Sequence, residues 1–177
     1  SNENISLSFN FADKILIISS ILLFHLAPFM INKNFFFELI KSSKKDLIIV
    51  SVFFIFLGLF FNYQPEFTGG GIFFQISNFF FNNNTLFYLI SFLSLILLYF
   101  LIKNSLGNFL IFLLLVVSNI QNTIYHKYYD PLILIIFMTL INFDIKKHFF
   151  DKKYRFIQLY LLSLCYLLIG IFKNQIY

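Results

Sequence analysis

The stretch Thr85–Ile102, TLFYLISFLSLILLYFLI, decides the fold class of this 177-residue chain. It holds thirteen Leu, Ile or Phe residues and no charged residue. As a helix it would be about 27 Å long, close to the ~30 Å thickness of the hydrocarbon core of a bilayer. Each Leu, Ile or Phe favours insertion into lipid by roughly 0.3–0.6 kcal/mol. The stretch therefore predicts a transmembrane helix.

Composition extends this interpretation to the whole chain. Hydrophobic residues make up 59% of the sequence and charged residues only 12%, whereas a soluble domain has about 25% charged residues. Because backbone groups in lipid must be paired within the protein, continuously apolar segments predict helices. We predict an all-α polytopic integral membrane protein, a single transmembrane domain over residues 1–177 with about six transmembrane helices. The spans are expected at about 15–31, 47–61, 85–102, 106–120, 131–143 and 156–172.

The placement of basic residues predicts the orientation. Of the thirteen Lys and Arg residues, ten lie in alternate loops: Lys33, Lys41, Lys44, Lys45, Lys103, Lys146, Lys147, Lys152, Lys153 and Arg155. The other two loops, 62–84 and 121–130, carry only Lys127. By the positive-inside rule, the lysine-rich loops are cytoplasmic and the other two face outward. We expect a bacterial inner membrane, with membrane lipid as a partner. Segments 34–45 and 72–81 combine apolar and polar residues as short interfacial helices do.

Several classes of function are not supported by the sequence. Cys165 is the single cysteine, and the three histidines are scattered over different predicted spans and sides, so we expect no metal site. The net charge is +5, but the basic residues flank apolar spans, which orients a membrane protein and does not indicate nucleic-acid binding. We expect no cofactor. Because no domain or targeting segment precedes the first span, we expect the chain to be part of a longer protein.

The stretch Tyr125–Pro131, YHKYYDP, is the first candidate site. Asp130 followed by Pro131 is typical of a helix start, which would turn its positive end toward the outer surface. His126, Lys127, Tyr128 and Tyr129 lie just before it. A cation and hydroxyl donors beside a helix N-terminus suit a phosphate, here a lipid headgroup or a polyprenyl phosphate. The alternative is that the tyrosines anchor at the interface while the lysine extends to water.

The stretch Pro65–Gly71, PEFTGGG, is the second candidate site. Its glycines permit tight turns or close approach of a ligand, and Glu66 could hydrogen-bond a sugar hydroxyl or act as a base. The alternatives are a flexible hinge and a solvated acid. No Gly-Lys-Ser/Thr follows, so a nucleotide phosphate loop is not predicted. The chain carries no paired-carboxylate motif and no nucleophile with a base at a defined spacing.

Residues His126–Ile135, HKYYDPLILI, resemble the basic-Tyr-x-x-Pro segment of multispanning GT-C-type glycosyltransferases. Those enzymes transfer a sugar from a polyprenyl-phosphate carrier on the extracytoplasmic side. Lys127 stands where arginine is usual, and Tyr128 and Pro131 match the aromatic residue and the proline. The resemblance implies that Lys127 holds the donor phosphate, although lysine cannot form the bidentate hydrogen bonds that arginine forms with phosphate.

The family's catalytic acids lie in an early outer loop, and the resemblance does not include such a loop in this chain. The resemblance therefore implies the C-terminal portion of such an enzyme, with its catalytic residues upstream. Tyr128, Tyr129 and Glu66 are then expected to meet sugar hydroxyls. The sugar and the acceptor stay open.

Two other functions also stay open, and neither is an enzyme. A transporter or flippase-like component would need polar groups facing one another at mid-membrane. The sequence offers only a few residues for that role: Ser19, Ser20, His25, Ser51, Ser91, Ser94 and Ser163. The other alternative is a non-catalytic membrane assembly subunit.

Overall fold

The computed structural model describes residues 10–30, 44–64, 69–103 and 105–118, and the single residues 124, 136, 161, 164 and 168. The chain forms two compact units. One comprises Ser1–His25 and Ser42–Asn142, and the other comprises Leu26–Lys41 and Phe143–Tyr177. The described side chains belong to the first unit, apart from three exposed leucines, and the following paragraphs concern that unit. The single domain over 1–177 stays a prediction.

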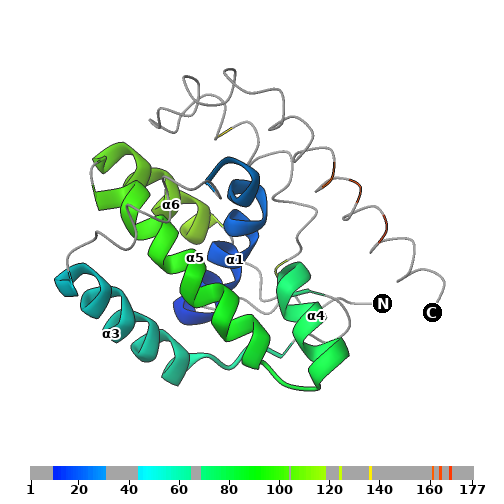
Figure 1. The fold of residues 1–177 in the computed structure, drawn as a ribbon. Helices are drawn as coiled ribbons and strands as arrows, with labels where there is room; N and C mark the ends of the chain where they lie inside the picture. The colour runs from blue at the N-terminus through cyan, green and yellow to red at the C-terminus, as the bar shows by residue number, and fades with distance from the viewer. Residues whose placement is uncertain are drawn as a thin grey trace. The chain divides into compact units, whose positions relative to one another are not determined.

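Helices account for nearly all of the described residues (Figure 1). They are α1 (Phe11–Met30), α3 (Lys44–Phe60), α4 (Gly71–Phe81), α5 (Thr85–Lys103) and α6 (Leu106–Ser118), and no strand occurs within the described ranges. The all-helical prediction is confirmed for this part of the chain. The predicted segments 15–31, 47–61, 72–81, 85–102 and 106–120 each coincide with one of these helices to within four residues. The predicted segments 131–143 and 156–172 lie outside the described residues, apart from four isolated helical positions, and of the predicted interfacial segment 34–45 only Lys44 and Lys45 are described, as the start of α3.

Length and apolar composition separate α5 from its neighbours. Among the described helices, α5 is the one that is long and apolar enough to cross a membrane. The helices α4 and α6 are apolar but shorter, with 11 and 13 residues. At 1.5 Å per residue, α6 is about 20 Å long, well short of the ~30 Å hydrocarbon core. The length and composition of α5 thus support one membrane span, and the total of six spans stays a prediction.

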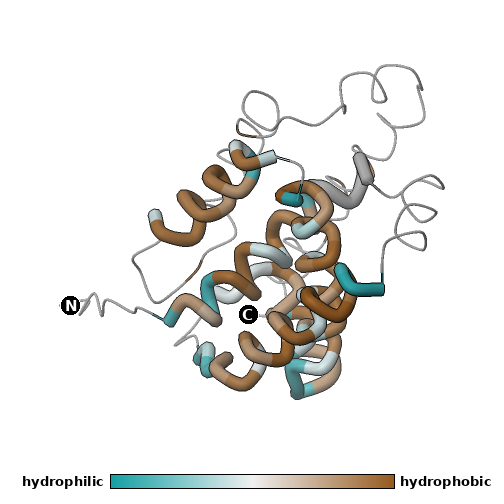
Figure 2. Tube along the Cα trace, turned by 90° about the vertical axis from the view of Figure 1, so that its left-hand side faces the viewer, coloured by the Kyte–Doolittle hydropathy of each residue, from teal (hydrophilic) through white to brown (hydrophobic). Residues whose placement is uncertain are grey.

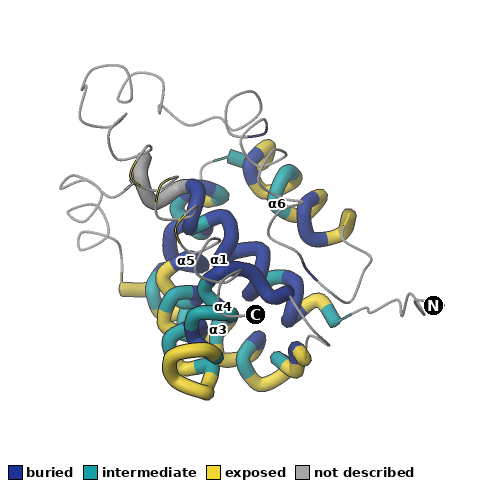
Figure 3. The backbone as a smooth tube through the Cα atoms, turned by 90° about the vertical axis from the view of Figure 1, so that its right-hand side faces the viewer, coloured by how far each residue is buried: buried dark blue, intermediate teal, exposed yellow. Residues whose placement is uncertain are grey.

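Serine side chains join α1 to α5, and α5 also packs against α3, α4 and α6. The Ser91 hydroxyl donates to the carbonyl of Leu16 (3.4 Å), and the Ser94 hydroxyl donates to the carbonyl of Ser19. The apolar residues beside these contacts, Leu16 and Ile17, are completely buried. Figure 3 shows the buried stretches of α1 and α5 next to each other. The interior of the unit therefore combines polar hydroxyl contacts with close apolar packing.

The outer surface of the unit is apolar. Large hydrophobic side chains are exposed on α3 (Ile48, Ile49, Val52, Phe53, Ile55, Phe56, Leu59 and Phe60) and on α6 (Leu106, Phe109, Leu110, Leu113, Leu114 and Val117). Figure 2 shows apolar residues along nearly the whole length of the helices. Soluble monomers rarely expose apolar patches of this extent, because each Å² in contact with water costs about 25 cal/mol. Apolar exposed faces around hydrogen-bonded serines are typical of helices that face lipid.

Contacts between helix ends show that α3 runs in the opposite direction to α5 and to α1. Asp46, in the first turn of α3, contacts Tyr99 and Lys103 in the last turns of α5. We call this the lysine end, because it also carries the exposed Lys44. The start of α1 instead contacts the residue after α3, through a bond from the Asn62 N–H to Asp13. We call this opposite end, defined by Asp13, Asn62, Tyr63, Gly70 and Ile124, the junction end.

Candidate functional site

The sequence-predicted site residues lie outside the described part of the chain. These are Glu66, His126, Lys127, Tyr128 and Tyr129, and their roles stay predictions. The structure does describe residues close to them in sequence on both segments: Gln64 and Gly69 around Glu66, and Ile124 two residues before His126. These neighbours show how the two candidate segments are attached to the helices.

The backbone carbonyl and the backbone N–H of Ile124 are both hydrogen-bonded, the first to Gly70 and the second to Tyr63. The N–H of Gly70 donates to the carbonyl of Ile124 (2.9 Å), and the N–H of Ile124 donates to the hydroxyl of Tyr63 (3.1 Å). Ile124 is 1% exposed, so both bonds are shielded from solvent. Buried backbone groups are costly to leave unpaired, which makes this arrangement a firm attachment. Ile124, which precedes Lys127 by three residues in the sequence, is therefore held beside Gly70 and Tyr63.

The three consecutive glycines make this attachment sterically possible. Gly69, Gly70 and Gly71 have φ values of 153°, 81° and 78°, a region that side chains other than hydrogen strongly disfavour. A Cβ atom at Gly70 would lie only 2.8 Å from Cγ of Phe74 and 3.0 Å from Cε1 of Tyr63. The glycines thus form a packed turn that starts α4.

Aromatic side chains from three elements hold the junction end together. The ring of Phe74 in α4 lies edge-on to Tyr63 (centroids 5.3 Å apart) and to Phe87 in α5 (5.3 Å). Phe61, which follows α3, contacts Phe87 (5.2 Å) and Tyr88 (5.6 Å). Edge-to-face pairs of this kind contribute about 0.5–1.5 kcal/mol each beyond the area that they bury. The Tyr63 hydroxyl is therefore held in position to accept the Ile124 bond.

A buried carboxylate lies at the same end of the unit. Asp13, which precedes the apolar run of α1, accepts bonds from the Asn62 N–H (2.9 Å) and from Nδ2 of Asn10 (2.7 Å). Burial raises the pKa of Asp13 above its ordinary value of 3.8, and the two hydrogen bonds offset part of that rise. Burial also lowers the pKa of the neighbouring Lys14. Asp13 ties the start of α1 to the loop that carries Tyr63.

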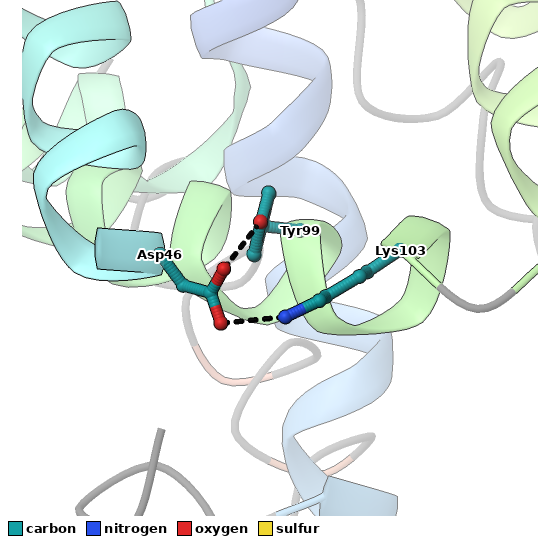
Figure 4. A network of polar contacts seen from close by, with 3 residues as sticks. All are labelled: Asp46, Tyr99 and Lys103. Atoms are coloured by element: carbon teal, nitrogen blue, oxygen red, sulfur yellow. Dashed lines mark hydrogen bonds and ion pairs between the residues drawn. The ribbon is translucent and has the colours of Figure 1, made fainter. Parts of the chain in front are cut away.

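A second polar network lies at the lysine end (Figure 4). One oxygen of Asp46 accepts from the Tyr99 hydroxyl (2.8 Å), and the other pairs with Nζ of Lys103 (2.6 Å). Both carboxylate oxygens are thus used to connect α3 with α5. Within the described ranges, no three His, Cys, Asp or Glu side chains gather as a metal site would require.

Sequence reasoning missed Asp13, Asp46 and Tyr63 as organising residues. Asp46 had a usable signal: it starts an apolar block, while Tyr99 and Lys103 stand four residues apart at the end of another. Such a spacing places two side chains on one helix face. The hydrogen bond between Ile124 and Tyr63 had no such signal in the sequence, because the two residues are 61 positions apart.

The packed turn at Gly70 can be tested with two glycine substitutions. Gly70→Ala should lower the free energy of unfolding by about 1–3 kcal/mol, because the new methyl group meets Phe74 and Tyr63 at an unfavourable φ. Gly58→Ala, within α3 and with open space around its Cβ position, should instead raise it by about 0.5–1 kcal/mol. Thermal unfolding in detergent measures both, and equal effects would refute the packed turn.

Asp13 predicts a specific dependence of stability on pH. Because its folded-state pKa is raised, the neutral carboxyl stabilises the folded protein, and this contribution is lost as pH rises through that pKa. Asp13→Asn cannot ionise, so the variant should become more stable relative to the parent between about pH 4 and pH 7. Melting temperatures of both proteins across this range measure the difference. A difference that stays constant with pH would contradict the raised pKa.

No protein-family model, no curated protein and no solved structure matches this chain. Its function has to be inferred from its own residues and their geometry.

Proposed function

We propose that this chain is the membrane-embedded C-terminal portion of a glycosyltransferase that uses a lipid-linked sugar donor on the extracytoplasmic side. The observation that carries the proposal is the double attachment of Ile124 to Gly70 and Tyr63. Glu66 lies three residues from Tyr63 in the sequence, and Lys127 lies three residues from Ile124. The attachment holds Tyr63 and Gly70, which flank Glu66 in the sequence, next to Ile124, which precedes Lys127, and this supports the proposal that the sugar-binding and phosphate-binding residues act together.

The surface of the unit supports a location in the membrane. A lipid-linked donor resides in the bilayer, so an enzyme that uses it must present its site where lipid and water meet. The apolar α5, together with the exposed apolar faces of α3 and α6, suits such surroundings. The polar contacts at Asp13 and Ile124 lie at one end of the helices, where a phosphate and a sugar would remain in water.

The expected roles follow from charge and hydrogen-bonding capacity. Lys127, assisted by His126, neutralises the donor phosphate near the predicted helix start at Pro131. Tyr128, Tyr129 and Glu66 hydrogen-bond the sugar hydroxyls. A carboxylate upstream of this chain activates the acceptor. The lysine end carries the exposed Lys44 and Lys45, so the positive-inside rule assigns it to the cytoplasm and the junction end to the outside.

The described serines support this function over transport. A transport path needs polar groups that can face a solute at mid-membrane. Ser19, Ser20 and Ser51 instead donate to backbone carbonyls of their own helices, at 2.7–2.9 Å. Ser91 and Ser94 donate to carbonyls of α1. The hydroxyl protons of these five serines are therefore already donated to backbone carbonyls and are not directed at a transported solute. A non-catalytic assembly subunit would differ from the proposed enzyme in binding no donor.

Lys127→Ala tests the proposal in the full-length protein. Loss of a charged partner of the donor phosphate should raise the donor KM roughly ten- to hundredfold, because such a hydrogen bond contributes about 1.5–3 kcal/mol. Lys127→Arg is the matched control and should keep or lower the donor KM, since arginine grips phosphate with two donors. Steady-state kinetics with a short-chain polyprenyl-phosphate sugar measure both variants. A donor KM unchanged in Lys127→Ala would reject the role of this residue.

A further inference from the structure

The outer face of α3 has a regular apolar pattern. Its large exposed residues come in four adjacent pairs, 48/49, 52/53, 55/56 and 59/60, each between 45% and 79% exposed. Pairs that recur every three or four residues form one broad stripe along a helix. The buried positions of α3, Asp46, Val50 and Leu57, lie within about 40° of one another around the helix, on a different side from Ile48, Val52, Ile55 and Leu59. One side of α3 thus packs within the unit, while the other offers a continuous apolar surface about 20 Å long.

Two exposed lysines stand at one end of this stripe. Lys44 and Lys45 form the start of α3, and Ile48 follows Lys44 by one helical turn. The acidic residue beside them, Asp46, is already engaged by Lys103 at 2.6 Å and by Tyr99 at 2.8 Å. This end carries three positive charges, on Lys44, Lys45 and Lys103, and one negative charge, on Asp46. The end of the stripe therefore carries an excess of positive charge.

The contact between Asp46 and Lys103 also keeps the stripe turned outward. It joins the first turn of α3 to the last turn of α5, and the rings of Phe54 and Phe92 meet further along the same pair of helices (5.2 Å). Both contacts use the side of α3 that faces α5. Consequently Ile48, on the outer side, remains available to molecules that surround the unit.

We propose that Lys44, Lys45 and the adjoining apolar stripe of α3 bind a phospholipid with an anionic headgroup. The headgroup phosphate lies against the two lysines, and the acyl chains lie along Ile48 and Val52. This proposal rests on the membrane location proposed above, but not on the glycosyltransferase activity. Half of the hydrocarbon core is about 15 Å thick, which corresponds to about ten helical residues. A lipid held at Lys44 therefore reaches to about Phe53, and Leu59 contacts the opposite leaflet.

The absence of tryptophan from the sequence allows a local fluorescence test. Ile48→Trp places one fluorophore beside the lysines, and Leu59→Trp places it at the far end of the same face. The 177-residue chain is reconstituted in phosphatidylcholine vesicles that contain a small fraction of dibrominated phosphatidylglycerol or of dibrominated phosphatidylcholine. Bromine quenches tryptophan fluorescence on contact. The ratio of quenching by brominated phosphatidylglycerol to quenching by brominated phosphatidylcholine, at the same mole fraction, therefore gives the local preference for the anionic lipid.

We expect the Ile48→Trp protein to prefer the anionic lipid about five- to tenfold, since a lysine near a membrane surface contributes about 1 kcal/mol. The Lys44→Gln/Lys45→Gln variant in the same background should bring this preference close to one. The Leu59→Trp protein should show no preference with or without the lysines. All four proteins should be quenched to a similar extent by brominated phosphatidylcholine.

Three results would overturn the proposal. A preference near one at Ile48→Trp removes the anionic site. A preference that survives Lys44→Gln/Lys45→Gln shows that other residues attract the lipid. Quenching at Leu59→Trp but not at Ile48→Trp shows that protein, such as a second copy of the chain, covers this part of α3. If neither position is quenched, a further reporter at the exposed Leu93 of α5 tests the membrane location separately. Quenching there leaves only the lipid site refuted, and no quenching refutes the membrane location as well.

Discussion

Hydrocarbon offers no hydrogen-bond partner, and every polar group that it surrounds must therefore be paired within the protein. This constraint accounts for the arrangement of the described helices. Ser91 and Ser94 direct their hydroxyls at carbonyl groups of α1, and the exposed surfaces of α3 and α6 are left to Ile, Leu, Val and Phe. In water the same surface would be unfavourable. The distribution of polar and apolar residues is thus the feature on which both the proposed function and the proposed lipid site depend.

The charged residues Asp13, Asp46 and Lys103 form contacts at the ends of the helices, and the two ends are built differently. At one end, Asp46 neutralises Lys103 and connects α3 with α5, while Lys44 and Lys45 stay exposed. At the other, Asp13 is buried and holds the loop that carries Tyr63, and Tyr63 in turn holds Ile124. The junction end, where Tyr63 and Gly70 hold Ile124, is the end at which we propose the donor site, whereas the lysine-rich end suits an anionic membrane surface.

The positions of the helices could be predicted from the sequence because each is a continuous apolar block with clear limits. Thr85–Ile102 is followed by Lys103, and the structure ends α5 at that lysine. The glycines before residue 72 permit a tight turn, a close approach to a ligand or a flexible hinge, and the structure shows a turn in which Gly70 packs against Tyr63 and Phe74. The contacts of Asp13 with Asn62 and of Tyr63 with Ile124 could not be predicted, because pairing across 49 and 61 positions leaves no periodic signal in one sequence. The candidate residues Glu66 and 126–129 lie outside the described part of the chain, and their roles stay predictions.

Cysteine accessibility tests most directly whether lipid separates the two ends. With Cys165 replaced by Ser, a single cysteine is introduced either at Asn83, in the exposed turn between α4 and α5, or at Lys45, at the start of α3. Intact cells are then treated with a membrane-impermeant maleimide. We predict that Asn83→Cys is labelled in intact cells and that Lys45→Cys is labelled only after the cells are opened. Labelling of both positions in intact cells, or of Lys45→Cys alone, would contradict the proposed arrangement across the membrane.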